Sequence, residues 1–568
     1  MPTSWARRRL RRPLLNPASQ VGEIQAAWAA FKAMLRAALR DPVWAVVAVI
    51  SSPLRYWRAW FFGLLFVTII AVVLSLIVQH VLPKGPLQMA GNAAVSLVLI
   101  VLIFRMITHP LVTHFGVQAA DTHGTARFAT DREIAPLTET KAGLLIGRTI
   151  RTKHPLYYDG PAHLLTMAPT RTGKGVGTVI PNLLTANRSV ICIDPKGENA
   201  AVTGQARNRF GPVHVLDPFG ATSVPTSAFN PLDRLDPDSL DVAEDAAVLA
   251  DALVYDAPGE AGEAHWNEEA KALITGVLLY IVGEEPAERR TLVTLRDYLT
   301  LAPDAFSALL ARMQASHAAG GLAARAANRH LGKSDREATG VLSSAQRHTH
   351  FLDSPRMAAV LDRSDFAFSD LRQRVATVFL VLPPDRIGAY ARWLRLMVSQ
   401  SLQDAMRTAR DGQGSVLYLL DEFAALGYLA PIERAMGLMA GYGLQLWPIL
   451  QDVHQLRATY GERAGTFLSN AGVLQVFGVN DYDSAKMVSD LLGSETVVFQ
   501  TASRALDSEK SGLSYSGHHT GRPLLTPDEV RNLGPDLELL FLSGLRPIVA
   551  QKLRYYADRE FAGLIHSS

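Results

Sequence analysis

The sequence predicts an α/β fold, with a parallel-sheet domain, an all-α insertion and an N-terminal transmembrane helical hairpin. Three observations predict it. Short apolar runs rich in strand-forming residues recur from about residue 160 onwards. A long stretch between two of these runs keeps the spacing of amphipathic helices. Two uncharged segments of 18 residues each lie before residue 105, and that is about the minimum length for crossing a bilayer.

The N-terminal segment, residues 1–58, is basic. The net charge before residue 60 is +8, although the whole chain carries only +3, so the remainder sums to −5. We expect a basic cytoplasmic segment, whose short apolar run Val43–Ile50 is interfacial or buried. Because the rest of the chain has no global positive field, an acidic polymer would have to meet local basic patches. The single cysteine, Cys192, excludes an internal disulfide and fits a reducing compartment.

The two uncharged segments, Phe61–Val78 and Leu87–Phe104, are separated by eight residues. They predict a transmembrane hairpin within residues 59–110. Arginines flank its outer ends and the connection carries only Lys84, so the positive-inside rule places both termini in the cytoplasm. A cleaved signal peptide is the alternative, but the first run begins late and a second run follows it.

The predicted strands are six apolar runs, several of which are apolar throughout, as strands buried on both faces of a sheet are. They are His163–Met167, Ser189–Ile193, Ala376–Leu382, Ser415–Leu420, Leu444–Leu450 and Val473–Val479. Near the end of the chain, Leu537–Phe541 and Ile548–Arg554 predict a hairpin through Gly544. A loop rich in Gly, Ser and His is expected at Ser508–Arg522.

The all-α insertion is predicted over residues 236–360, between the second and third of these strands. Val242, Ala246, Leu249 and Leu253 keep helical spacing there, and the Ala-rich segment Phe306–Arg329 continues the pattern. The insertion divides one nucleotide-binding domain into a first part, 111–235, and a second part, 361–568. The evidence that this domain binds a nucleotide comes from the motifs that follow.

The segment Ala168–Gly175 (APTRTGKG) nearly matches a phosphate-binding loop, G-x-x-x-x-G-K-[ST]. In such a loop backbone N–H groups face the phosphate, the lysine reaches the terminal phosphates and the hydroxyl binds magnesium. The pattern alone favours a glycine-rich turn, because alanine and glycine replace its first and last positions. The preceding strand and the predicted helix Val176–Leu184 favour a nucleotide site, because a helix N-terminus attracts anions. The expected contacts are Pro169, Thr170, Arg171, Thr172, Gly173, Lys174, Gly175 and Val176, with Thr172, Thr178 or water replacing the missing hydroxyl.

The acidic partner of this loop is expected to be Asp421 with Glu422, which follow the predicted strand Ser415–Leu420. Asp421 can hold the magnesium ion while Glu422 polarises the attacking water. The alternatives are Asp194, which follows another strand but has no adjacent carboxylate, and an ordinary helix N-terminus at Asp421.

Two further site residues are expected. Gln451 ends the strand Leu444–Leu450, where a polar residue senses the γ-phosphate in ATPases of the RecA type, although it could equally be a solvated strand end. A subunit junction would also need an arginine acting on the neighbouring site. Arg522 is the first candidate, and Arg372 or Arg374 is the second.

Several motifs occur in an order known from one family. They are HGTARFA, APTRTGKGVGTVIPNLL, ICIDPKGEN, HWNEEAKALITGVLLYI, VLPPD with YARWLRLMV, LYLLDEFAALG, PILQDVHQL and GRPLLTPDEV. On these motifs the chain resembles the coupling proteins of type IV secretion systems, the TraG/VirD family of conjugal transfer. The resemblance runs from about residue 55 to the end, and the first fifty residues match nothing recognisable.

This resemblance implies a RecA-like P-loop ATPase that uses ATP and Mg²⁺, anchored in the bacterial inner membrane and forming a homohexamer around a channel. An all-α domain would recruit the cargo, which is relaxase-bound single-stranded DNA, effector proteins or both. The protein would then deliver that cargo to the secretion channel. The family's loop commonly lacks the final hydroxyl, so Gly175 fits it. The short outward connection leaves little periplasmic mass, so contact with the channel would run through the membrane helices.

Two other functions remain possible on the sequence. One is an FtsK-like translocase of double-stranded DNA, although a long linker and a recognisable C-terminal winged helix are lacking. The other is a docking receptor that nucleotide only stabilises, with little hydrolysis. Single-strand binding usually needs aromatic residues among basic ones. No such cluster stands out in the sequence, so DNA contact is implied by the resemblance alone.

Overall fold

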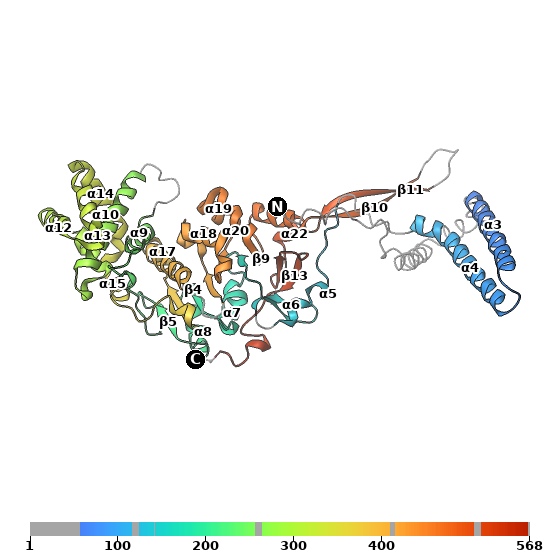
Figure 1. Ribbon diagram of the computed structural model, residues 1–568, viewed down its shortest axis with the longest axis horizontal. Coiled ribbons are helices and arrows are strands. Elements are labelled where there is room, and N and C mark those ends of the chain that lie inside the picture. Colours follow the sequence, from blue (N-terminus) through green and yellow to red (C-terminus); the bar gives the residue numbers. More distant parts are fainter. Residues whose placement is uncertain are drawn as a thin grey trace. The chain divides into compact units, whose positions relative to one another are not determined.

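The computed structural model describes residues 57–115, 124–140, 143–255, 264–408, 415–504 and 513–565 (Figure 1). The expected interfacial run Val43–Ile50 lies outside these residues. The chain divides into two compact units. One contains Met1–His123 with Thr496–Gly521, and the other contains Gly124–Glu495 with Arg522–Ser568.

The first unit contains two long helices, α3 (Trp57–Val81) and α4 (Pro86–Phe115). They pack against each other at Gly91, where an added Cβ would come within 3.0 Å of a Val78 methyl group. Small residues allow such close packing between helices. Within α3, residues Phe61–Val81 are long and apolar enough to cross a membrane, whereas the apolar part of α4 covers only Pro86–Ile100.

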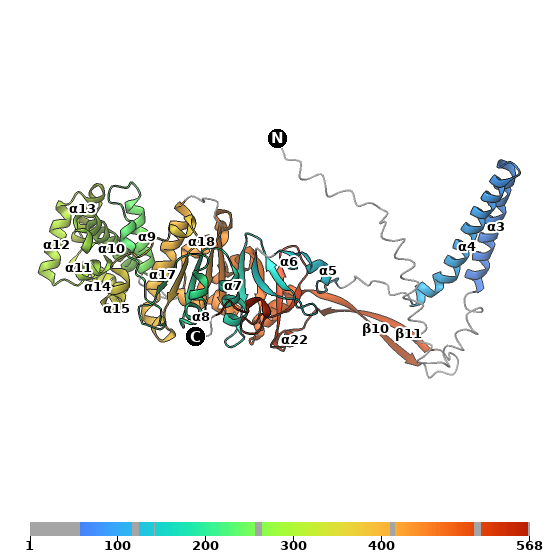
Figure 2. The same ribbon diagram turned by 90° about the horizontal axis from the view of Figure 1, so that it is seen from below.

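The second unit is built around an eleven-stranded sheet in the order β2-β1-β13-β12-β9-β3-β8-β7-β4-β6-β5 (Figures 1 and 2). The strands are β1 (Leu144–Arg148), β2 (Pro155–Tyr158), β3 (His163–Met167), β4 (Val190–Asp194), β5 (Val213–Leu216), β6 (Thr377–Val381), β7 (Val416–Leu420), β8 (Leu444–Leu450), β9 (Ala471–Val476), β12 (Leu537–Leu542) and β13 (Ile548–Gln551). From β9 to β5 every neighbouring pair is parallel, and the strands on the other side of β9 are antiparallel. The predicted α/β class, the six strands and the terminal hairpin are confirmed; β1, β2 and β5 were not predicted.

Both faces of the parallel sheet are buried, because alternate residues of each strand enter two different apolar clusters. In β4, Ile191 and Ile193 join one cluster while Val190 and Cys192 join the other. The first face is covered by α17 (Pro384–Arg407), α18 (Ala430–Leu438), α19 (Val453–Tyr460) and α20 (Ala464–Asn470). The second face is covered by α7 (Ile180–Thr185) and α8 (Glu198–Arg207). This double cover explains why the strands read as continuous apolar runs.

Between β5 and β6 the described residues form helices and turns without a strand, where the sequence predicts an all-α insertion. The helices are α9 (Val242–Leu253), α10 (Ala264–Glu284), α11 (Leu292–Leu299), α12 (Pro303–Ala315), α13 (Ala318–Leu331), α14 (Asp335–Thr349), α15 (Pro355–Leu361) and α16 (Asp370–Gln373). Helix α10 lies at their centre and packs against α9, α13 and α14. Their apolar residues continue the core on the first face of the sheet.

The loop expected at Ser508–Arg522 is wrong for its second half. Residues Leu513–Pro523 form strand β11, which pairs with β10 (Ser494–Arg504) in a separate two-stranded sheet. Local composition suggested a loop because Gly, Ser and His disfavour regular structure. The pairing partner lies outside that window, so composition could not reveal it. The remaining short helices are α5 (Asp131–Ile134), α6 (Pro136–Glu139), α21 (Tyr482–Leu492) and α22 (Pro527–Arg531).

Candidate nucleotide site

The order of the strands brings the predicted site elements together. Strands β3, β8 and β7 are parallel neighbours, so their carboxyl ends lie on one edge of the sheet. The loop Ala168–Gly175 follows β3, Asp421 and Glu422 follow β7, and Gln451 follows β8, which lies between the other two. The carboxyl edge of a parallel sheet is the usual ligand site of α/β folds.

Four of the predicted side chains form one connected cluster at this edge. The distance from Lys174 Nζ to Asp421 Oδ1 is 2.8 Å, and from Lys174 Nζ to Glu422 Oε2 it is 3.3 Å. Gln451 Nε2 donates to Glu422 Oε1 at 3.4 Å. Burial alone would lower the pKa of Lys174, but the attraction of Asp421 and Glu422 outweighs it and raises that pKa above its ordinary value.

The backbone at the site is strained in two places. Among the described residues only four that are not glycine have a positive φ, and two of them are Arg171 (67°) in the loop and Glu422 (62°). Gly173, with a φ of 89°, is the third residue of the site that has a positive φ. Such conformations are costly for residues with a Cβ and concentrate at functional sites.

The loop has room for an anion. A Cβ added at Gly173 or Gly175 would meet no atom within 4 Å, so both positions face open space. The chain then enters a π-helical turn, Gly175–Val179, which continues into α7 and whose N-terminal N–H groups favour negative charge. Gly177 is different, because an added Cβ would lie 3.2 Å from the Phe477 ring and from a backbone oxygen. A glycine is needed there for close packing.

The residues present fit a magnesium ion held mainly by water and a ligand. Among the described residues, no group of three or more His, Cys, Asp or Glu side chains could hold a metal ion alone. One carboxylate next to a phosphate loop is the usual protein contribution to Mg²⁺, which keeps several waters. Asp421, beside the lysine of the loop, is placed to supply that carboxylate. Of the two threonines considered for the missing hydroxyl, Thr178 is fully buried and donates to Gln475 Oε1, so it does not face the loop's open side. Thr172 donates its hydroxyl to Pro169 O at 2.7 Å.

A buried polar network, which the sequence analysis missed, supports the loop from behind. Gln475 on β9 accepts from Thr166 and Thr178, and it donates to Glu538 on β12 at 2.8 Å. Beside this network Lys552 Nζ donates to Thr172 O at 3.2 Å and to Phe477 O at 2.8 Å. The only sequence signal was a polar residue within or beside an otherwise apolar strand, as in GVLQV and LELLFL.

Glu538 is completely buried, and burial raises its pKa to about 8 against the opposing effects of the Gln475 hydrogen bond and the Lys552 charge. The folded chain therefore keeps a proton that the unfolded chain releases above a pKa of 4.5. The free energy of unfolding should accordingly fall as the pH rises from 4.5 to about 8. Glutamine does not titrate. We therefore predict that Glu538→Gln makes the decrease in unfolding free energy over this pH interval smaller by about 2–4 kcal/mol. Thermal unfolding of the detergent-solubilised chain at mildly acidic and mildly alkaline pH measures it, and an unchanged pH dependence in the variant would contradict the prediction.

Asp194, the alternative acid, follows β4 and caps a helix. Its Oδ2 accepts from the Ala200 backbone N–H at 2.8 Å at the start of α8. Burial and the nearby charge of Asp421 raise the pKa of Asp194 to about 6, although the hydrogen bond from Ala200 acts in the opposite direction. A cap of this kind stabilises the helix and leaves Asp421 as the acid nearest the lysine.

The candidate arginines have other partners within the chain. Arg522, at the end of β11, pairs with Glu529 at 2.6 Å. Arg372 and Arg374 precede β6 and therefore lie at the amino edge of the parallel sheet, opposite the loop. Arg372 donates to Gly443 O at 3.4 Å, and Arg374 pairs with Asp370 at 3.0 Å.

Comparisons with known proteins agree with the motifs. The family model described as type IV secretory system conjugative DNA transfer matches residues 127–565. A conjugal transfer protein TraG from Escherichia coli is 29% identical, and the match covers 77% of each chain. Protein VirD4 from Agrobacterium fabrum is 30% identical over 77% of this chain and 66% of its own.

Solved structures show the same fold. The unbound conjugative coupling protein TrwBdeltaN70 superposes with a TM-score of 0.59 at 19% identity, and the match covers 75% of this chain and 92% of that one. TrwB in complex with the ATP analogue ADPNP matches with a TM-score of 0.56 at 20% identity, covering 75% of this chain and 93% of that one. At this level of identity the likeness concerns the fold, and it confirms the predicted RecA-like architecture.

Proposed function

Because the chain belongs to the type IV secretory system conjugative DNA transfer family, we propose that it is a coupling ATPase of the bacterial inner membrane. It would recruit relaxase-bound single-stranded DNA, effector proteins or both, and deliver them to the secretion channel. The observation that carries the ATPase part is the cluster of Lys174, Asp421, Glu422 and Gln451 at the carboxyl edge of the sheet. Family membership favours this function over an FtsK-like translocase.

The residues would divide the chemistry as follows. The backbone of residues 169–176 cradles the phosphates of ATP, and Lys174 leaves its two carboxylate partners to reach the terminal phosphates. Asp421 holds Mg²⁺, which supplies charge stabilisation for phosphoryl transfer. Glu422 takes a proton from the attacking water. Gln451, hydrogen-bonded to Glu422, reports the departure of the phosphate along β8.

The membrane anchor is proposed to be a hairpin. Helix α3 supports a first crossing, and the second crossing is proposed for Leu87–Phe104 of α4 because those 18 residues carry no charge. The basic segment 1–58 would keep the N-terminus in the cytoplasm, together with the bulk of the chain.

The assembled form is proposed to be a homohexamer. In that form Arg522 of one subunit would act on the nucleotide of the next. Its present ion pair with Glu529 is half-exposed on the surface. Pairs of this kind contribute little to stability, so the arginine can change partners.

The experiment that tests the proposed function measures transfer of a mobilisable plasmid and export of effector proteins from cells that lack the gene, with the wild-type gene returned as control. Loss of either transport process, with restoration by the wild-type gene, supports the coupling role. Normal transport of both cargoes without the gene would contradict it. The hydrolysis rate of the purified assembly separates a motor from the docking-receptor alternative, which would bind ATP without turning it over.

Lys552 should be required for tight nucleotide binding, although it lies behind the loop. Because the loop's N–H groups must face the phosphates, its carbonyls point outward and need donors of their own. Lys552 donates a hydrogen bond to one of these carbonyls, Thr172 O. We predict that Lys552→Met weakens binding of a fluorescent ATP analogue about tenfold, the usual loss for one hydrogen bond from a charged group, and raises KM more than it lowers kcat.

Lys552→Arg, which keeps a donor, should recover part of this affinity. Lys196→Met, at an exposed lysine near the same edge of the sheet, is the matched control. Equal affinities of the wild type and Lys552→Met would show that the loop keeps its shape without this lysine.

A further inference from the structure

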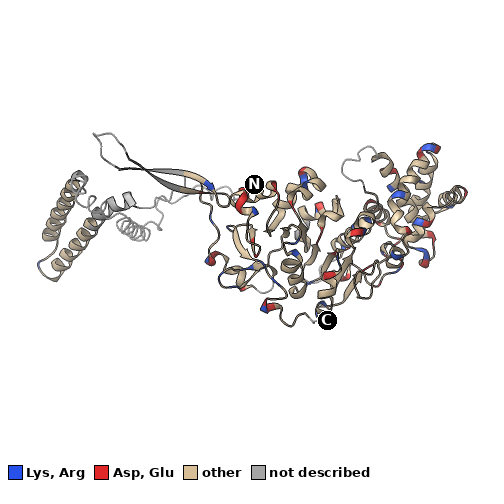
Figure 3. Cartoon of the chain, turned by 180° about the vertical axis from the view of Figure 1, so that it is seen from behind, with Lys and Arg blue, Asp and Glu red and all other residues tan. Residues whose placement is uncertain are grey.

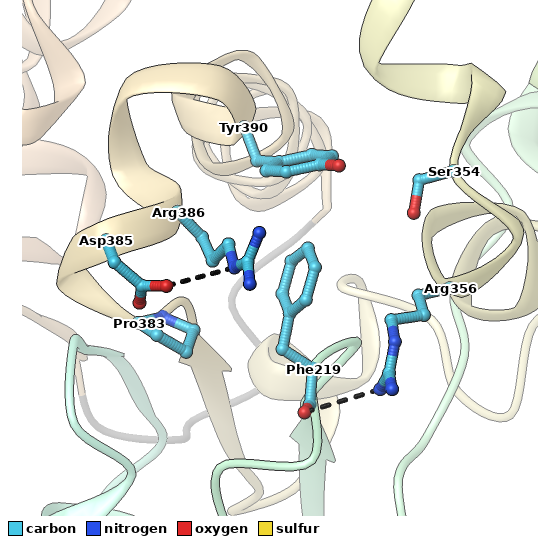
Figure 4. Close-up of a pocket in the computed structure, with 7 residues that line it drawn as sticks. All are labelled: Phe219, Ser354, Arg356, Pro383, Asp385, Arg386 and Tyr390. Atoms are coloured by element: carbon cyan, nitrogen blue, oxygen red, sulfur yellow. Dashed lines mark hydrogen bonds and ion pairs between the residues drawn. The ribbon is translucent and has the colours of Figure 1, made fainter.

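A cavity of about 430 Å³ opens near the carboxyl ends of β5 and β6, away from the nucleotide cluster (Figure 4). Its lining includes two aromatic rings and two guanidinium groups from three separate segments. Phe219 lies in the loop after β5, Arg356 lies in α15, and Arg386 and Tyr390 lie in the first turns of α17. The nucleotide cluster uses none of these four side chains, and Phe219 and Tyr390 are only partly buried where they pack against the edge of the core.

The rings present a stacking surface. The centroids of Phe219 and Tyr390 are 4.9 Å apart with an angle of 61° between their planes, so a planar ligand stacks on one ring rather than between the two. The Arg386 guanidinium lies 5.6 Å from the centroid of the Phe219 ring and covers one face of it. The other face of Phe219 is turned toward the side of the cavity that carries Arg356, and the edge of Phe219 points at the ring of Tyr390 (Figure 4), so Phe219 is the ring that can take a planar ligand.

The two arginines give the cavity a positive character. Arg386 Nε lies 3.1 Å from Asp385, a surface ion pair that leaves its other N–H groups for a ligand. Arg356 Nη1 donates to Phe219 O at a long 3.4 Å, and its side chain is otherwise directed into the cavity in Figure 4. With one carboxylate against two guanidinium groups, the lining is net positive.

The loop that carries Phe219 is held in a defined shape. Asp217, nearly fully buried, accepts from the backbone N–H groups of Ala221 and Thr222 at 3.0 and 2.7 Å. Gly220, with a φ of 67°, lies in the turn between Asp217 and Ala221. On the other side of the cavity, α17 also carries Arg395, which donates to Leu426 O and Tyr428 O in the segment after Glu422. One helix thus joins the cavity to the acidic turn of the nucleotide site.

We propose that this cavity binds one nucleotide of a single-stranded nucleic acid, with the base stacked on Phe219 and the backbone phosphate held by Arg356 and Arg386. The volume falls within the range of about 300–1,000 Å³ that small-ligand pockets span. Aromatic rings among arginines bind single strands because every base has a stacking face. A duplex covers those faces, so the cavity selects unpaired bases, whereas an acidic peptide would use the arginines alone. The inference rests on the proposed function, since it names a contact for the DNA cargo.

The test measures binding of a fluorescently labelled oligothymidylate to the detergent-solubilised full chain by anisotropy, without ATP. Replacing both arginines (Arg356→Ala with Arg386→Ala) should weaken binding about tenfold or more and flatten its salt dependence. Phe219→Ala should weaken it about tenfold, whereas Phe219→Tyr, which keeps the ring, should bind as the wild type does. Arg363→Ala is the matched control, because Arg363 is an exposed arginine paired with Asp365 outside the cavity.

Wild-type affinity in the double arginine variant and in Phe219→Ala would overturn the proposal. So would a loss of binding to a labelled polyglutamate peptide in these variants while oligonucleotide binding stays intact, because the cavity would then be a site for acidic proteins. Thermal unfolding of each variant shows whether its fold is kept. Since no hydrolysis is measured, a chain without ATPase activity can still pass this test, and an active ATPase can fail it.

Discussion

Glu422→Gln should abolish ATP hydrolysis while leaving ATP bound. Glu422 is the group in the cluster that we assign to accept a proton from water, because Asp421 is assigned to Mg²⁺, Lys174 is charged and Gln451 is an amide that donates to Glu422. General-base catalysis of this kind contributes about 10²–10⁴ in rate. We therefore expect kcat to fall by about that factor. Glutamine keeps the size of the side chain and its contact with Gln451, so the fold and the strained backbone at this position should persist.

The rate of phosphate release and the affinity for a fluorescent ATP analogue are the two measurements. Glu462→Gln, at an exposed glutamate on the same domain, is the matched control and should behave as the wild type does. A Glu422→Gln protein that hydrolyses ATP at the wild-type rate would remove Glu422 from the mechanism, and a variant that no longer binds ATP would assign it a binding role instead.

Lys174→Ala should stop cargo export without affecting membrane insertion. The lysine contacts both carboxylates, at 2.8 and 3.3 Å. Its removal takes away the group that would bind the terminal phosphates. It also leaves Asp421 and Glu422 as two neighbouring negative charges that repel the nucleotide. We expect ATP affinity to fall by at least about tenfold, since truncating one partner of a close charge pair costs 2–5 kcal/mol.

Plasmid transfer from donor cells and fractionation of their membranes test this prediction together. Lys196→Ala is the matched control, because it removes an exposed lysine near the same edge of the sheet. Export at the wild-type level from Lys174→Ala cells would refute the motor mechanism. A variant missing from the membrane fraction would show that the lysine is needed for folding or insertion rather than for catalysis.

Basic and acidic residues are interspersed along the described part of the body (Figure 3). Composition could not show where a few of them gather. Arg356 and Arg386 lie 30 residues apart in the chain, and Phe219 lies far before both. Only the packing of α15, α17 and the loop after β5 places them around one cavity. A search of the sequence for aromatic residues among basic ones could therefore not identify this cavity.

The sequence by itself determined the α/β class, the positions of six of the seven parallel strands and the place of the loop that we propose binds phosphate. These features depend on local signals: apolar runs of strand length, and a loop whose chemistry needs a few residue types in a row. It also pointed to Asp421, Glu422 and Gln451, because each follows a buried strand directly.

Only the tertiary structure decided which strand ends are neighbours, and so placed Lys174 against Asp421 and Glu422. It also revealed Gln475, Glu538 and Lys552 behind the loop and replaced half of an expected loop with strand β11. The physical reason is common to all of these. Contacts between segments that are from about ten to several hundred positions apart depend on which strands pair and in what order, and this leaves no trace in the composition of any one segment.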